Sequence, residues 1–248
     1  MSPKSKRRET VSAVLRFVIL LLATLFLTLL LVVLFAPRGG DKTGQTADAP
    51  LKSEAVIYLD PGHGDFDFGA VATLNDGTAL REKDLVLSLA RDAAALLRAR
   101  GYTVILSREG DERHTYTTSA AEVYARRDDA AKKGATHLIS IHANAYAGEG
   151  RAFGARVYYD PEAQGASQAA TRFAAAVTGA TEGRALRECR TVPDGSYAIL
   201  TAPDVTALLF ECGFLSDPAE RALLCDADYC ARLASGIAQG IEAILTSK

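Results

Sequence analysis

The stretch AVIYLDPGHG, residues 55–64, carries the strongest fold signal in this chain of 248 residues. Its first half is a short apolar run, which ends at the structure-breaking pair Pro61 and Gly62. A short apolar run bounded by turn residues is typical of a buried strand. His63 then lies between two glycines, where the backbone can approach a ligand closely. The stretch therefore predicts a buried strand that leads into a ligand-binding turn.

Strand and helix signals alternate from this stretch to the C-terminus. Such alternation is typical of an α/β fold with a mainly parallel twisted sheet and helices on both faces. We therefore expect residues 54–248 to form one domain of this class. The predicted strands are 55–60, 103–107, 136–142, 154–160 and 206–211. The predicted helices are 84–100 capped by Asp84, one from a Ser119–Glu122 capping box to Gly134, 164–177, and one from about Asp228.

Titratable residues follow three of the predicted strands. His63 comes after the first strand, His142 ends the third, and Glu211 ends the last. Ligands of open α/β sheets bind beyond the carboxyl ends of the strands, so these three side chains should converge at one edge. Glu82 lies in a loop directly before a predicted helix and can join them.

Two histidines and a carboxylate suit a catalytic Zn²⁺ with an open fourth position. Zinc activates a water and polarises a carbonyl, and a second carboxylate is needed to carry the proton to the leaving amine. The pattern leaves open which of the two glutamates is the ligand. The alternative for each histidine is a hydrogen-bonded structural residue at a strand end. A buried, unpaired Glu211 would be costly, which favours the metal site.

His137 is expected to be structural, and His114 is expected at the surface, where the alternative is that it lines a substrate groove. His137 lies at the opposite end of the strand that carries His142, and His114 lies in a polar stretch expected at the surface. No C-x-x-C pair occurs, so a structural zinc site is not expected. A disulfide is left open for an exported protein, whereas Cys212 is expected to pack as a small apolar side chain. The other cysteines are Cys189, Cys225 and Cys230.

The formal net charge of −2 conceals an uneven distribution. Residues 1–16 carry five basic residues against Glu9, a balance of +4, so the rest of the chain carries −6. Residues 17–36 are uncharged and would span roughly 30 Å as a helix, the thickness of a bilayer core. We expect a single-pass anchor in the cell membrane, with the N-terminus in the cytoplasm. A flexible linker at 37–53 should then connect it to an exported domain on the extracytoplasmic side of the membrane. The alternative is a cleaved signal peptide, whose apolar region is usually shorter.

The composition excludes other classes of protein. With 48% hydrophobic and 23% charged residues, the chain is neither disordered nor of low complexity. It lacks the basic excess of a nucleic-acid-binding protein, so no nucleic acid is expected as a partner.

Four segments that carry the predicted site residues resemble the zinc-dependent N-acetylmuramoyl-L-alanine amidases of the amidase-3 type. They are LDPGHG at 59–64, EKD at 82–84, SIHANA at 140–145 and ECGFLSD at 211–217. The resemblance implies that Zn²⁺ is bound by His63, Glu82 and His142. It also implies that Glu211 is the general base. The implied reaction hydrolyses the amide between the lactyl group of N-acetylmuramic acid and the L-alanine of the peptidoglycan stem peptide.

The chain departs from the family pattern at three positions outside the chemistry. The family usually has Gly where this chain has Asp65, and Asn where it has Lys132 and Asp217. The segment 143–154 is too short for the family's autoinhibitory helical insertion.

The resemblance also bears on biological setting. The short anchored layout and the residues Tyr197 and Leu200 resemble the branch that trims spore cortex; wall remodelling during growth is the alternative. Two further functions are considered: a zinc peptidase of the stem peptide, and a non-catalytic wall-binding module. The expected partner is peptidoglycan. Because no wall-binding repeat accompanies the domain, targeting is expected from the anchor, the linker or a protein activator.

Overall fold

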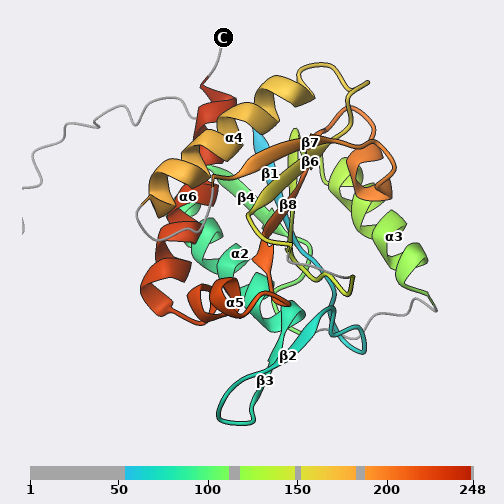
Figure 1. The fold of residues 1–248 in the computed structure, drawn as a ribbon. Helices are drawn as coiled ribbons and strands as arrows, with labels where there is room; N and C mark the ends of the chain where they lie inside the picture. The colour runs from blue at the N-terminus through green and yellow to red at the C-terminus, as the bar shows by residue number, and fades with distance from the viewer. Residues whose placement is uncertain (1–53, 112–117, 149–151, 183–187, 247–248) are drawn as a thin grey trace, which may run out of the picture. The chain divides into compact units, whose positions relative to one another are not determined.

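The computed structural model describes residues 54–111, 118–148, 152–182 and 188–246, all within the compact unit Pro50–Lys248. A six-stranded sheet with the order β4-β1-β5-β8-β6-β7 forms its centre (Figure 1). Strands β4, β1, β5 and β8 are parallel, which confirms the α/β class and the mostly parallel sheet. The strands are β1 Val56–Pro61, β4 Thr103–Leu106, β5 His137–Asn144, β6 Arg156–Tyr159, β7 Arg190–Pro193 and β8 Thr206–Phe214.

One predicted strand runs against the others. Strand β6 pairs with β8 in antiparallel orientation, and β7 follows β6 in parallel. Only residues 145–155 separate β5 from β6, which is too short for the helical crossover that a parallel return requires. The chain therefore turns back and β6 enters the sheet in the opposite direction.

Helices cover the two faces of the sheet unequally. Helices α2 (Glu82–Ala99), α4 (Ala166–Thr181) and α6 (Ala227–Leu245) pack on one face; α3 (Ser119–Lys132) and the short 3-10 helix η1 (Ala198–Thr201) lie on the other (Figure 1). Leu138 and Leu209 belong to the core beneath α3. Side chains in a strand alternate between faces, so His142 and Glu211 also lie on the α3 face.

Three predicted helix starts are wrong by one or two residues, and one of them is that of α4, which begins at Ala166 and not at 164. Helix α2 begins at Glu82, and its N-cap, Arg81, provides no side-chain cap. The preceding loop caps it instead, because Ala70 O and Phe68 O accept hydrogen bonds from the first backbone amides of the helix. Thr118 caps α3 by accepting a hydrogen bond from the amide of Ala121, so the cap lies one residue before the predicted capping box.

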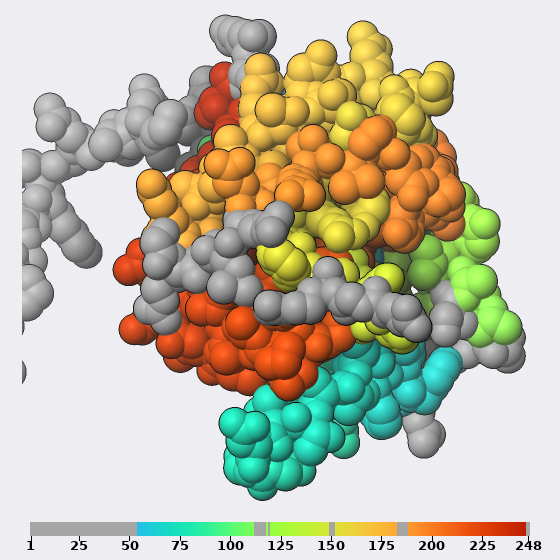
Figure 2. All heavy atoms as spheres, viewed as in Figure 1, coloured from blue at the N-terminus to red at the C-terminus, as the bar shows by residue number. Residues whose placement is uncertain are grey.

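Short elements are missing from the prediction. The hairpin of β2 (Val71–Thr73) and β3 (Ala79–Arg81) projects from the body of the domain (Figure 2). Helix α5 (Pro218–Leu224) is capped by Asp217 and is tied to β8 by Glu220, whose side chain accepts from Phe214 N at 2.7 Å. Elements of three to seven residues are too short to produce a recognisable periodicity.

The predicted tail, anchor and linker, residues 1–53, lie outside the described residues. In the part of the chain that the structure describes, no helix is both long and apolar enough to cross a membrane.

A buried ionic network joins α3 to the end of β1. Arg126 Nε lies 2.9 Å from Asp60 Oδ1, and Arg126 donates to Glu122 Oε1 at 2.7 Å. Asp60 is fully buried and also accepts a hydrogen bond from Ser140 Oγ. Burial alone would raise the pKa of Asp60, but the charge of Arg126 and the hydrogen bond from Ser140 help to lower it. The network fixes α3 against the strand that leads into the His63 turn.

Replacing Arg126 with Met should strongly destabilise the protein, because Asp60 and Glu122 would stay buried without their cation. Removing one partner of a buried ion pair costs about 3–5 kcal/mol. Urea unfolding of the full-length chain measures the free energy of unfolding. Arg127→Met is the matched control, because Arg127 pairs with Asp128 at a partly exposed position and should cost less than about 1 kcal/mol. Equal losses in the two variants would contradict a stabilising role for the network.

Candidate metal centre

His63, Glu82 and His142 meet at the carboxyl edge of the parallel strands. Glu82 Oε1 lies 3.0 Å from His63 Nε2 and 3.0 Å from His142 Nδ1. One candidate ligand atom from each residue lies within 4.8 Å of the others. The two imidazole rings pack edge to face with centroids 4.8 Å apart. The structure thus brings together the three residues that the family resemblance named as ligands.

Glycines make room for this cluster. A Cβ atom on Gly62 would lie 2.2 Å from His142 Cε1, and one on Gly69 would lie 2.5 Å from Glu82 Oε2. His63 itself has a φ of +62°, in the left-handed region that side chains rarely adopt. The turn therefore holds His63 in a strained backbone conformation while glycines let the other two side chains approach.

Glu82 is held by backbone amides in addition to its contacts with the two histidines. Only 4% of Glu82 is exposed; its Oε1 accepts from Ala143 N at 2.9 Å and its Oε2 from Ala70 N at 2.8 Å. Burial alone would raise the pKa of Glu82, but the hydrogen bonds and charges of His142 and His63 hold it below its usual range. Glu82 is therefore kept as a carboxylate, the form that binds metal.

The donor set fits a zinc ion. Two imidazoles and one carboxylate are typical protein ligands of catalytic zinc, and three is the usual number. Both histidine side chains remain about one-fifth exposed, so the cluster is accessible to a substrate. Burial would lower the pKa of His63, yet Glu82 and Asp67 raise it to about 9. These close carboxylates make the site attractive to a cation.

Asp67 contacts the cluster and was not singled out by the sequence interpretation. Asp67 Oδ2 lies 2.9 Å from His63 Nδ1, and its Oδ1 accepts from Gly69 N at 3.0 Å. A proton on Nδ1 shared with this carboxylate directs the other ring nitrogen, Nε2, toward Glu82. The available signal was an acidic residue four positions after His63 in a glycine-rich loop.

The buried Arg108 supports the same turn through hydrogen bonds. It is 4% exposed and donates to Pro61 O at 3.1 Å, Gly62 O at 2.9 Å and Lys83 O at 2.8 Å. One guanidinium therefore binds the His63 turn and the start of α2 together, which sets the relative position of His63 and Glu82.

Glu211 lies beside the cluster. It is the register partner of His142 in the parallel pairing of β5 and β8. Its Oε2 is buried and has no hydrogen-bond partner among the described residues. Burial raises the pKa of Glu211 to about 7, with the positive influence of His142 opposing and the charge of Glu82 adding to the shift. A carboxyl group with this pKa can accept and return a proton near neutral pH.

The remaining predicted residues lie away from the cluster. His137 is at the amino end of β5, where its Nδ1 lies 2.9 Å from Thr136 Oγ1. His114 lies outside the described residues. All four cysteines are free thiols in the structure, so no disulfide forms, and Cys212 is buried in the apolar core as expected.

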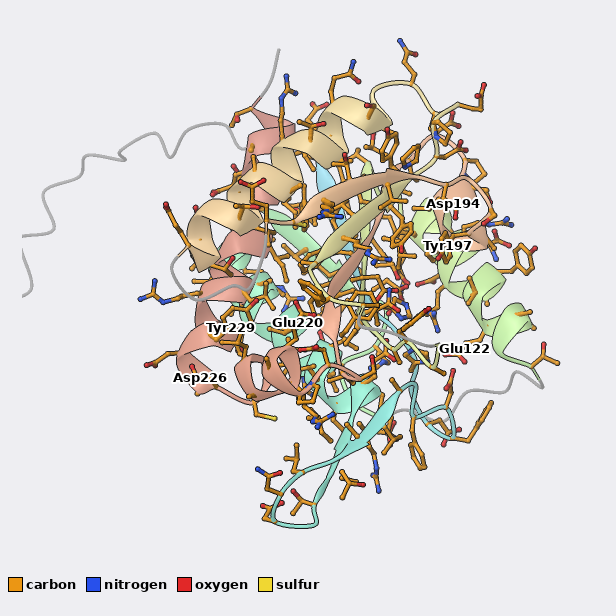
Figure 3. The ribbon with its side chains drawn as sticks, viewed as in Figure 1. Glu122, Asp194, Tyr197, Glu220, Asp226 and Tyr229 are labelled. Atoms are coloured by element: carbon orange, nitrogen blue, oxygen red, sulfur yellow. The ribbon has the colours of Figure 1, made fainter. Side chains whose placement is uncertain are left out.

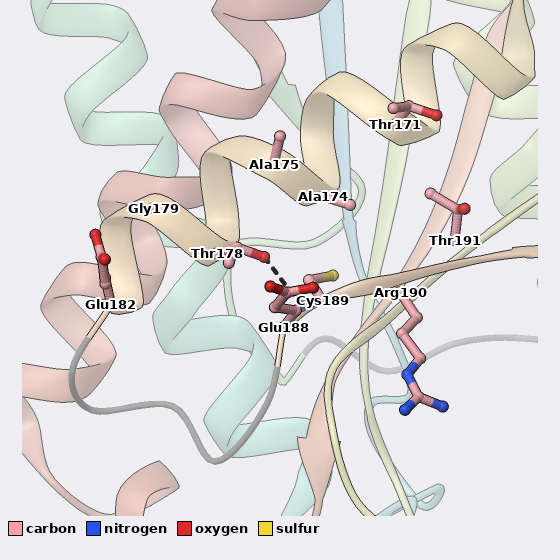
Figure 4. A pocket seen from close by; sticks show the side chains of 10 residues that line it. All are labelled: Thr171, Ala174, Ala175, Thr178, Gly179, Glu182, Glu188, Cys189, Arg190 and Thr191. Carbon is pink, nitrogen blue, oxygen red and sulfur yellow. Dashed lines mark hydrogen bonds between the residues drawn. The ribbon is translucent and has the colours of Figure 1, made fainter.

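Two cavities of the domain differ in their distance from the His-Glu-His cluster. A cavity of about 940 Å³ lies between α4 and β7, and Figure 4 shows Thr178, Cys189 and Arg190 among its lining residues. None of the cluster residues lines it. A smaller cavity of about 170 Å³ is lined by His142 and Glu211. The His-Glu-His cluster and the larger cavity therefore lie on separate parts of the domain.

Comparison with known proteins identifies similar chains. AmiC of Neisseria meningitidis is 32% identical over 228 residues, which cover 75% of this chain and 52% of that protein. This chain thus spans about half of that relative. The germination-specific N-acetylmuramoyl-L-alanine amidase of Bacillus subtilis is 31% identical over 206 residues, covering 80% of this chain and 83% of that protein.

Solved structures agree with these relatives. An N-acetylmuramoyl-L-alanine amidase from Clostridium difficile 630 matches with a TM-score of 0.67 and 28% identity, covering 78% of this chain and 98% of that one. The CwlD amidase of Clostridioides difficile, solved with the GerS lipoprotein, matches with the same score and identity and covers 77% and 98%. The amidase-3 family model, described as N-acetylmuramoyl-L-alanine amidase, matches residues 57–243. This match covers nearly the whole sheet and includes His63, Glu82, His142 and Glu211. The chain therefore belongs to the amidase-3 family of N-acetylmuramoyl-L-alanine amidases.

Proposed function

We propose that the domain hydrolyses the amide between N-acetylmuramic acid and L-alanine in peptidoglycan. In this proposal His63, Glu82 and His142 hold a zinc ion, and Glu211 is the catalytic acid and base. The observation that carries the proposal is a His-Glu-His cluster beside a buried carboxylate oxygen that no described residue satisfies. Family membership supports the reaction class.

The residues divide the chemistry between them. A zinc ion in this cluster supplies Lewis acidity, which polarises a carbonyl and makes a water nucleophilic near neutral pH. Glu211 accepts the proton of the attacking water and donates it to the leaving nitrogen of L-alanine. Asp67 holds the His63 ring in one orientation, and Arg108 holds the turn against α2. Departure of a neutral amine needs that returned proton, so one carboxyl group serves both halves of the reaction.

The biological setting is also part of the proposal. The uncharged segment 17–36 anchors the protein in the cell membrane with its N-terminus in the cytoplasm and the catalytic domain outside. A role in spore cortex is supported by the similarity to the germination-specific enzyme of Bacillus subtilis. CwlD, a similar amidase, was solved with a lipoprotein, which supports a protein partner for this chain.

Replacing Glu211 with Gln should abolish hydrolysis but leave the metal bound. Loss of the group that transfers the proton should lower kcat about 100- to 10,000-fold. Mass spectrometry of digested peptidoglycan should show free stem peptides with L-alanine at the amino end for the wild type only. Glu242→Gln, on the far end of α6 and paired with Arg100, is the control and should remain active. Comparable activity of the Glu211 and Glu242 variants would refute the assigned role.

Replacing Asp67 with Asn should weaken zinc binding about 10- to 100-fold, because the amide holds the His63 ring less strongly. Competition with a chromophoric chelator measures the affinity in the purified protein. Asp76→Asn, in the turn between β2 and β3, is the matched control and should bind zinc like the wild type. An unchanged affinity in the Asp67 variant would show that this carboxylate does not orient the ligand.

Asp67→Asn should also retain most of its activity at saturating zinc, because Asp67 does not contact the reacting atoms. Titrating zinc while following hydrolysis distinguishes this loss of affinity from a loss of turnover. An activity that stays below about one-tenth of the wild type at every zinc concentration would contradict a purely orienting role.

A further inference from the structure

A small cavity opens beside the proposed catalytic base, on the α3 face of the sheet. Its volume is about 170 Å³, below the roughly 300–1,000 Å³ of pockets that enclose a whole small molecule. It lies where η1, α3 and the ends of β5 and β8 meet; Figure 3 shows Tyr197 and Glu122 on this side of the sheet. The space is suited to one small group of a larger substrate. Its lining includes Val123, Ala198, Ile199, Leu209, His142 and Glu211.

The cavity has apolar walls in part, and Arg126, Ser140 and Tyr197 line it as well. Ile199 and Leu209 are buried members of the core beneath α3, and Val123 packs against the same core. Glu211 also lines the cavity, and its buried Oε2 has no hydrogen-bond partner among the residues that the structure describes. A group that enters this space therefore meets both aliphatic side chains and a hydrogen-bond acceptor.

The position of Glu211 decides which part of the substrate lies closest to the cavity. The group that protonates a leaving nitrogen must come within hydrogen-bond reach of it. In the proposed reaction that nitrogen belongs to L-alanine, whose Cα carries a single methyl group. The methyl group is thus two bonds from the atom that Glu211 serves, whereas the lactyl carbonyl lies on the metal side.

The charges beneath the cavity disfavour an acidic occupant. Arg126 lines the cavity, but this cation is already paired with Asp60 and Glu122. Two carboxylates around one guanidinium, with Glu211 nearby, leave no positive charge for a further carboxylate. A short neutral side chain is compatible with both the volume and the charge.

We propose that this cavity receives the side chain of the first stem-peptide residue and sets the preference of the enzyme for L-alanine at that position. The inference rests on the proposed amidase function and adds a specificity site to it. Ala198 of η1 and Val123 of α3 both line the cavity, so the size of their side chains controls the size of the accepted residue.

The first experiment narrows the cavity by replacing Ala198 with Leu in the full-length chain. Three synthetic muramoyl peptides differ only in the first residue, which is Gly, L-Ala or L-Val. One buried methyl group is worth about tenfold or more in kcat/KM, so the wild type should prefer L-Ala over Gly by at least that factor. Ala198→Leu should bring the ratio of L-Ala to Gly to about one or below. Ser196→Leu places the same side chain on the nearby exposed loop and should keep the wild-type ratio.

The second experiment widens the cavity by replacing Val123 with Ala, which removes two methyl groups from the part of the lining that α3 provides. This variant should cleave the L-Val peptide about tenfold better, relative to L-Ala, than the wild type does. A gain of activity on a larger substrate cannot arise from poor folding.

The outcomes separate the two proposals. Equal losses on all three peptides in Ala198→Leu, with no gain in Val123→Ala, would overturn the specificity site. Failure of the wild type to cleave any peptide between the lactyl group and the first residue would refute the proposed function. In that event equilibrium binding of the same peptides judges the cavity: Ala198→Leu must weaken the L-Ala compound and spare the Gly compound, and any other pattern rejects the site.

Discussion

The site depends on three carboxyl groups at one edge of the sheet that lose contact with water through burial. They differ in the hydrogen bonds and charges that replace this water. Asp60 is paired with Arg126 and accepts from Ser140, so it remains a structural anion. Glu82 is surrounded by two imidazoles and two backbone amides, which keeps it ionised and available to a cation. Glu211 receives no such compensation at Oε2, and burial raises its pKa to about 7. The same physical cost thus yields an anchor, a proposed ligand and a proposed proton carrier.

This difference addresses the ambiguity that the residue pattern leaves between the two glutamates. In the sequence, Glu82 directly precedes a predicted helix and Glu211 ends a predicted strand, and both are expected near the histidines. Their hydrogen bonds separate them: Glu82 Oε1 is 3.0 Å from both histidines, whereas Glu211 is only the register neighbour of His142. The geometry therefore favours Glu82 as the ligand, in agreement with the role that the family resemblance implies.

Much of this arrangement could be predicted because it follows from local pattern. The parallel strands β1, β5 and β8 read as apolar runs, and their ends place His63, His142 and Glu211 at one edge. The reversed direction of β6 could not be predicted in this way, since burial on both faces gives the same pattern in either direction. The contact of Ser140 with Asp60 joins residues 80 positions apart, and that of Arg108 with Gly62 joins residues 46 apart. Such contacts exist only once the sheet is assembled, so sequence spacing carries no trace of them.

The strained turn at His63 requires support from the rest of the fold. A non-glycine residue at a φ of +62° is costly, and it persists where surrounding contacts determine it. Here Arg108 binds the preceding carbonyls and Asp67 binds the ring, while the buried Arg126 network fixes the strand before the turn. The most direct test of the account is anomalous diffraction at the zinc edge from crystals of the zinc-loaded protein. The account predicts one zinc ion bound by His63, Glu82 and His142, with Glu211 nearby but outside the coordination sphere. A zinc ion bound by Glu211 in place of Glu82, or located away from this cluster, would contradict it.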